Sequence, residues 1–216
     1  MKTAKHDREI LMPETRAAWR RWLTRNHATS SGVWPVYYKK HAAAKRLTYE
    51  AALLEALCFG WIDSRIRALD QDRCRQIFSP RNAKSVWSMP NKARIVQLIA
   101  QGLMRPAGQA KIDAAKADGS WYQLDAAESL EMPADLTRKL RRNASARRNF
   151  LALSAWARKR LLWWIHSAKR PETRQRRIGQ LLERVSTIAA KGAVAVYTII
   201  ASTGSRRATG LPRGKN

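Results

Sequence analysis

The sequence predicts an α+β protein, in which a small N-terminal α+β module with a few-stranded sheet precedes a C-terminal helical region. Three observations support this class. Strand-like alternation and turn-forming residues occur within the first 90 residues. After Pro90, apolar residues recur at helical spacing between single Gly and Pro residues. The chain has 216 residues, 45% of them hydrophobic, which suffices for a core in one large domain or two small ones.

The α+β module is predicted over residues 13–90, and two helices are expected in it. The first covers residues 14–25. Its apolar residues are spaced by three and four positions: Trp19, Trp22 and Leu23. The second helix begins after Thr48, whose hydroxyl suits an N-cap, and ends at Gly60.

Three strands are expected in the same module. Residues 33–39 alternate in polarity, and Pro35 favours an edge position because it lacks a backbone N–H. One face of this strand is expected to carry three apolar or aromatic residues: Trp34, Val36 and Tyr38. Two further strands, at 64–69 and 73–79, are predicted around a turn at 70–72.

Helices are predicted throughout the region 91–190. They begin at residue types that favour helix N-termini: Asn91, Pro106, Pro133, Asn143, Ser154 and Pro171. The last two helices are expected to pack as a hairpin. We interpret residues 1–12 as a flexible N-terminus and residues 191–216 as an extension with a disordered basic tail.

The balance of charge is strongly basic, with 42 Lys and Arg against 16 Asp and Glu and a formal net charge of +26. Such a field attracts polyanions, so nucleic acid, anionic lipid headgroups and acidic proteins are candidate partners. Weak, nonspecific nucleic-acid binding at low salt is expected for the same reason. The alternative is that the charge reflects a generally basic host proteome.

The location expected for the chain is the cytoplasm, because residues 1–12 are charged and lack the apolar run of a secretory signal. No transmembrane segment is predicted, since the apolar run at 192–201 has only about ten residues, roughly half the length of a spanning helix. Cys58 and Cys74 lack CxxC spacing, which argues against a disulfide framework and a structural metal site.

Motifs for catalysis or cofactor binding are not visible in the sequence. None of the four histidines lies in a local catalytic signature. The His, Cys and carboxylate residues do not have metal-ligand spacing, and no GxGxxG or Walker sequence is present. The sequence therefore predicts neither a cofactor nor a metal.

Polar and aromatic residues gather near the ends of the predicted strands, and we expect them to converge in a pocket: Tyr38, Lys39, Trp61, Asp63, Arg65, Arg81 and Trp87. Such a pocket would suit a small anionic or peptide ligand. Residues 78–88 also resemble a basic, aromatic platform for single-stranded nucleic acid. The alternative is that Trp61 and Trp87 fill the core while Asp63 forms a local turn or ion pair.

A second candidate site is the Arg-rich segment 168–178. It places Arg170, Arg174 and Arg177 near one helical face, at spacings of four and three residues. That face is a candidate for binding an anion such as phosphate. The alternative is an ordinary solvated face, which Glu172 would partly neutralise.

Several segments carry a resemblance to known proteins: PETRAAWRRWL, ATSSGVWPVYYKK, LTYEAALLEALCFGWIDSRI, FSPRNAKSVWS, NKARIVQLIAQGLM and WWIHSAKRPETRQRRI. Their order and spacing from about residue 13 to 190 are similar to those of the YdeI/OmpD-associated family. The resemblance implies a bacterial protein, and the family labels mention bacteriocin protection and association with an outer-membrane porin. It implies no reaction, cofactor or catalytic residue.

Three functional hypotheses follow. The first is a non-enzymatic binding protein of bacterial stress, envelope defence or bacteriocin protection, which acts through its basic surface. The second is a basic nucleic-acid-associated protein, favoured by the charge and by residues 78–88. The third is an enzyme of unknown reaction that uses Tyr38, Asp63 and Arg65 of the N-terminal module.

Overall fold

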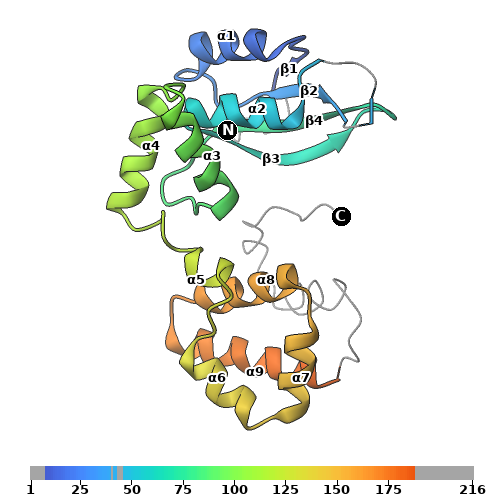
Figure 1. The fold of residues 1–216 in the computed structure, drawn as a ribbon, viewed down its shortest axis with the longest axis vertical. Helices are drawn as coiled ribbons and strands as arrows, with labels where there is room; N and C mark the ends of the chain where they lie inside the picture. Colours follow the sequence, from blue (N-terminus) through green and yellow to red (C-terminus); the bar gives the residue numbers. More distant parts are fainter. Residues whose placement is uncertain (1–7, 40, 43–45, 188–216) are drawn as a thin grey trace, which may run out of the picture. The chain divides into compact units, whose positions relative to one another are not determined.

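The computed structural model describes residues 8–39, 41–42 and 46–187, and it divides into two compact units, one ending at Trp121 and one beginning at Tyr122 (Figure 1). Each unit has its own hydrophobic core. The first contains a mixed sheet with helices and the second is helical, which confirms the predicted α+β class. The predicted tail at 191–216 lies outside the described residues.

A four-stranded sheet in the order β1-β2-β4-β3 forms the centre of the N-terminal unit. Its strands are β1 (Ile10–Leu11), β2 (Trp34–Tyr38), β3 (Trp61–Ala68) and β4 (Arg73–Pro80). The antiparallel hairpin of β3 and β4 confirms the two strands predicted around residues 70–72. Strand β3 begins at Trp61, three residues before the start predicted at residue 64.

The prediction that β2 is an edge strand is wrong, because β2 lies between β1 and β4. β1 comes from the segment expected to be flexible, of which residues 1–7 lie outside the described part. The pairing tolerates Pro35 because it uses the neighbouring N–H: Trp34 N donates to Glu9 O at 2.8 Å.

Helix α2 (Tyr49–Cys58) begins after Thr48 as predicted, and α1 (Arg16–Asn26) begins two residues after the predicted start at residue 14, with Thr15 as its N-cap. The side chain of Thr15 accepts from Ala18 N at 3.1 Å, and that of Thr48 accepts from Ala51 N at 3.2 Å. α2 packs on the sheet and α1 packs against α2 (Figure 1).

Two more helices, α3 (Met89–Ala100) and α4 (Pro106–Ala117), complete the N-terminal unit, which therefore extends beyond the range 13–90 assigned by sequence pattern. α3 contributes Leu98 to the core. α4 comes so close to α2 that a Cβ added to Gly108 would lie 2.3 Å from Cys58 O. Only glycine fits there without a shift of the backbone.

The C-terminal unit contains five helices among the described residues: α5 (Asp125–Glu128), α6 (Ala134–Arg141), α7 (Ala144–Ala152), α8 (Ala155–His166) and α9 (Pro171–Thr187). The side chains of Asn143 and Ser154 cap α7 and α8. α8 and α9 pack against each other as predicted. Among the described residues, no helix is long and apolar enough to cross a membrane.

Candidate anion-binding site

A polar network joins three strands to α2 in the N-terminal unit. The Gln76 amide donates to Asp63 Oδ2 and to Ser64 O, and its Oε1 accepts a hydrogen bond of 2.5 Å from the Tyr37 hydroxyl. Tyr49, the first residue of α2, donates to Asp63 Oδ2 at 3.2 Å. The Asp63 carboxyl therefore has partners that lie far from it in sequence, and the sequence pattern did not single out Tyr49 or Gln76.

Burial raises the pKa of Asp63 above its ordinary value, although the hydrogen bond from Tyr49 and the positive charge of Arg81 act in the opposite direction. Burial also lowers the pKa of Arg81 to about 10, so this guanidinium stays charged at pH 7. It lies 3.6 Å from the ring centroid of Trp87, and its Nη2 donates to Val86 O at 2.7 Å. Asp63, Arg81 and Trp87 thus belong to one region of the unit.

The two tryptophans of the predicted pocket are core residues. Trp61 and Trp87 are only 1% and 2% exposed. The indole N–H of Trp61 donates to His27 O at 3.1 Å, and the ring of Trp87 lies 5.0 Å from that of Trp121. They therefore provide no walls for an open pocket, and residues 78–88 do not present Trp87 to solvent.

The remaining residues of the predicted pocket lie elsewhere. Tyr38 pairs with Arg73 in the sheet register, whereas Asp63 pairs with Phe78, five positions farther along β4. Five positions of a strand span roughly 17 Å. Lys39 Nζ donates to Asp70 O at 2.8 Å and so closes the β3–β4 turn.

Arg65 is exposed on β3, next to an irregularity in the register between Asp63 and Ile66. The expected convergence of the seven residues therefore does not occur. The reason is that Tyr38 and Lys39 lie at the turn end of the β3–β4 hairpin, and Asp63 lies near the opposite end.

Two of the three candidate anion-binding residues, Arg174 and Arg177, lie on helix α9 and form contacts inside the C-terminal unit. Arg174 donates to both oxygens of Asp135, at 2.7 and 3.0 Å, and to Ile165 O at 3.4 Å. Arg177 donates to Trp164 O and to Ser167 Oγ. These carbonyls belong to the last turn of α8, where no further turn supplies N–H donors. Arg174 and Arg177 therefore close the end of α8, and only Arg170 is exposed.

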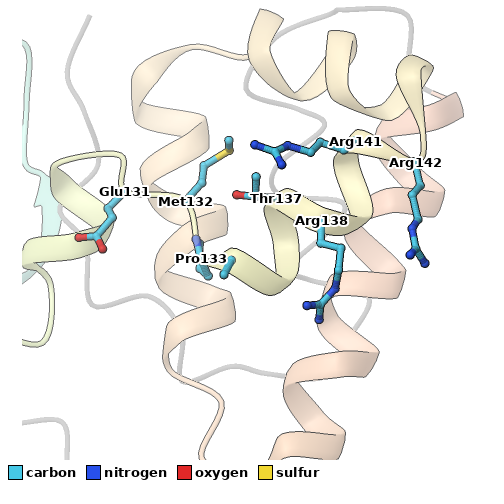
Figure 2. Close-up of a pocket in the computed structure, with 8 residues that line it drawn as sticks. Glu131, Met132, Pro133, Thr137, Arg138, Arg141 and Arg142 are labelled. Carbon is cyan, nitrogen blue, oxygen red and sulfur yellow. The ribbon is translucent and has the colours of Figure 1, made fainter.

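A surface hollow of about 650 Å³ lies beside α6 in the C-terminal unit (Figure 2). Three arginines line it: Arg138, Arg141 and Arg142. All three are exposed, and no carboxylate of residues 8–39, 41–42 or 46–187 forms an ion pair with them. Glu131 also lines the hollow, but Figure 2 shows its carboxylate directed away from the arginines.

The hollow lies in the most basic stretch of the chain. Residues 136–171 contain no Asp or Glu but eleven Lys and Arg residues: Arg138, Lys139, Arg141, Arg142, Arg147, Arg148, Arg158, Lys159, Arg160, Lys169 and Arg170. The sequence pattern did not single out the arginines at α6, because the prediction for segment 168–178 considered the spacing of its arginines and not the distribution of carboxylates along the chain. The absence of carboxylates over 36 residues was the signal that could have found them.

A metal centre has no support in the described part of the chain, where no group of three or more His, Cys, Asp or Glu side chains is placed to hold an ion. Cys58 and Cys74 are both free thiols and buried. The exposed guanidinium groups beside α6 carry the positive charge and the N–H donors that suit the binding of an anion.

Residues 129–187 match the family model described as Bacteriocin-protection, YdeI or OmpD-Associated. The C-terminal unit therefore carries a YdeI/OmpD-associated domain. The YdeI/OmpD-associated domain contains the hollow at α6 and all of α9. Residues 11–111, which carry several of the segments quoted above, match a separate model, Domain of unknown function (DUF8412).

Comparisons with curated proteins and with solved structures found no match. The YdeI/OmpD-associated relationship therefore rests on the one family model matched by residues 129–187, and it supplies no reaction or ligand for this chain. The functional argument depends on the geometry of the α6 surface.

Proposed function

We propose that this chain is a non-enzymatic binding protein, and that its YdeI/OmpD-associated domain attracts the phosphate backbone of nucleic acid through the exposed arginines of α6. The observation that carries the proposal is the group Arg138, Arg141 and Arg142, which lines one hollow without carboxylate partners in the described part of the chain. A planar guanidinium can donate two hydrogen bonds to one phosphate, which favours arginine for this task.

The surrounding charge supports the same function. Arg147 and Arg148 follow on α7 and are exposed, and the acid-free stretch 136–171 supplies no local neutralisation. At physiological salt the Debye length is about 8 Å, so charges on neighbouring helices act together on an approaching polyanion. The nucleic-acid hypothesis is therefore the one that the geometry supports best.

The structure gives less support to the other two hypotheses, bacteriocin protection and an enzyme. The family description suggests bacteriocin protection as the physiological setting, and we propose the cytoplasm as the location in which binding takes place. The enzyme hypothesis relied on Tyr38 acting together with Asp63 and Arg65, and the sheet register separates Tyr38 from Asp63.

The salt dependence of binding to a DNA duplex tests the proposal. Fluorescence anisotropy with a labelled duplex of about 20 base pairs, between about 50 and 200 mM salt, gives the slope of log K against log salt concentration. The triple variant Arg138→Gln/Arg141→Gln/Arg142→Gln is expected to reduce the slope by about 0.9 for each lost phosphate contact, and by roughly two to three in total.

The matched control removes three exposed arginines from the other unit: Arg21→Gln/Arg25→Gln/Arg105→Gln. It changes the net charge by the same amount, so it is expected to lower the slope by less than one if α6 is the binding surface. Equal effects of the two triple variants would show that only the overall charge matters, and the assignment to α6 would then fail.

A further inference from the structure

The outer face of the N-terminal sheet carries an aromatic and arginine cluster that the sequence pattern did not single out. Side chains alternate along strands, so Tyr37 and Gln76, which join the network with α2, point to the inner face. Tyr38 and Arg75 are adjacent to these residues, and Trp34 is three positions before Tyr37. All three side chains therefore point to the opposite, outer face. Arg67 is directly opposite Arg75 in the register of β3 and β4 and shares this face.

The cluster has a defined geometry. The guanidinium of Arg75 lies 5.0 Å from the Trp34 ring centroid, and that of Arg67 lies 5.9 Å from it. A second pair lies farther along the same face, where the Arg46 guanidinium is 6.0 Å from the ring of Tyr38. Strands β3 and β4 and Arg46, two residues before the N-cap of α2, thus place guanidinium groups over the aromatic rings of β2.

The charges at the centre of this face have no carboxylate partner. Arg67 is exposed, and neither Arg67 nor Arg75 forms an ion pair with any residue that the structure describes. Arg75 Nε is buried without a hydrogen-bond partner among the described residues. At the margin, by contrast, Arg46 and Arg73 are paired with Glu14 and Asp70.

We infer that the outer face of this sheet binds single-stranded nucleic acid, with bases stacked on the guanidinium planes and on Tyr38, and with phosphates held by the free N–H groups. Unpaired bases stack on aromatic rings and on arginine planes, whereas the bases of a duplex are already stacked and cannot reach an open sheet face. An anionic lipid surface or an acidic protein would use the charge and the N–H groups, but neither supplies bases that stack on the guanidinium planes and on Tyr38. This inference adds a second surface to the proposed function, and it does not depend on the arginines of α6.

The competing explanation is that Arg67 and Arg75 only shield the ring of Trp34, which is 8% exposed, from water. Lysine separates the two explanations, because it keeps the charge and the apolar stem but lacks the planar group. The informative variant is therefore Arg67→Lys/Arg75→Lys. Its matched control is Arg21→Lys/Arg25→Lys on the exposed side of α1.

The experiment compares two fluorescent probes that carry the same phosphates: a single-stranded oligonucleotide of about 12 residues and an abasic sugar–phosphate strand of equal length. The parent protein is expected to bind the base-bearing strand roughly tenfold more tightly than the abasic strand. Arg67→Lys/Arg75→Lys is expected to abolish this ratio and to leave the affinity for the abasic strand unchanged. Tyr38→Leu is expected to reduce the ratio by a smaller factor, and the control pair should keep it.

The outcomes separate the two proposals. A ratio near one in the parent protein, or a ratio that Arg67→Lys/Arg75→Lys leaves intact, would overturn the inference about the sheet. The α6 triple variant is expected to weaken binding of both strands by the same factor and so to keep the ratio. If the α6 triple variant weakens the binding of neither strand and the ratio of the two affinities persists, the proposed role of α6 is wrong and the inference about the sheet face is retained.

Discussion

Helices α6 and α9 carry similar arginine patterns, yet their arginines have different surroundings. Arg138, Arg141 and Arg142 on α6 are exposed around a hollow. On α9, Arg174 holds Asp135 and Arg177 donates to the end of α8. The surroundings of the arginines explain the difference. The arginines of α9 reach carbonyl oxygens at the C-terminal end of α8. The exposed arginines of α6 face solvent.

This comparison shows why the density of arginine is a poor guide to an anion-binding site. A guanidinium that already donates to a carboxylate or to helix carbonyls has few N–H groups left for a phosphate. The segment 168–178 has the higher density of charge, but its Arg174 and Arg177 serve the fold. The absence of Asp and Glu from residues 136–171 is the better indicator.

The largest expected effect concerns the arginines that serve the fold. Arg174→Ala removes the ion pair with Asp135 and one donor to the end of α8, so it is expected to lower the free energy of unfolding by about 1–3 kcal/mol. Urea unfolding followed by circular dichroism measures this loss. Arg138→Ala is the matched control on α6, and a similar loss in both variants would erase the distinction between the two helices.

A smaller effect, which depends on pH, is expected from the carboxylate of the same pair. The guanidinium of Arg174 holds the pKa of Asp135 below its ordinary value of 3.8. Because the unfolded chain then binds this proton at a higher pH than the folded chain, the pair's contribution to stability is complete above pH 3.8 and is lost as the pH falls through the folded pKa.

Asp135→Asn removes that contribution at every pH. The difference in the free energy of unfolding between the parent and Asp135→Asn should therefore shrink as the pH falls from about 5 to 2. Urea unfolding at several pH values measures the difference. A difference that stays constant over this range would show that Arg174 does not stabilise the ionised form.

The smallest expected effect is on the stability of the α6 triple variant. Arg138→Gln/Arg141→Gln/Arg142→Gln should change the free energy of unfolding by less than about 0.5 kcal/mol, because exposed side chains without partners contribute little. The same urea series measures it. A loss above about 1 kcal/mol would place these arginines with those of α9, among the residues that serve the fold.

Several elements were predictable because their causes are local. The caps of α1 and α2 depend on a threonine and an N–H three residues later, and the β3–β4 hairpin depends on alternation around a short turn. β1 was not predictable in this way. It is two residues long and forms a parallel pair with a strand more than twenty residues away, so its own sequence carries almost no signal.

The candidate sites show the same division between local and long-range causes. The sequence by itself determined the fold class, most of the helix starts, the excess of positive charge and the resemblance to the YdeI/OmpD-associated family. Tertiary structure alone decided which arginines are tethered and which are free, because Arg174 meets Asp135 across 39 residues of chain. The partner of Arg75 on the outer sheet face is likewise Trp34 of another strand. Local pattern records how much charge a segment carries, whereas long-range packing determines what that charge contacts.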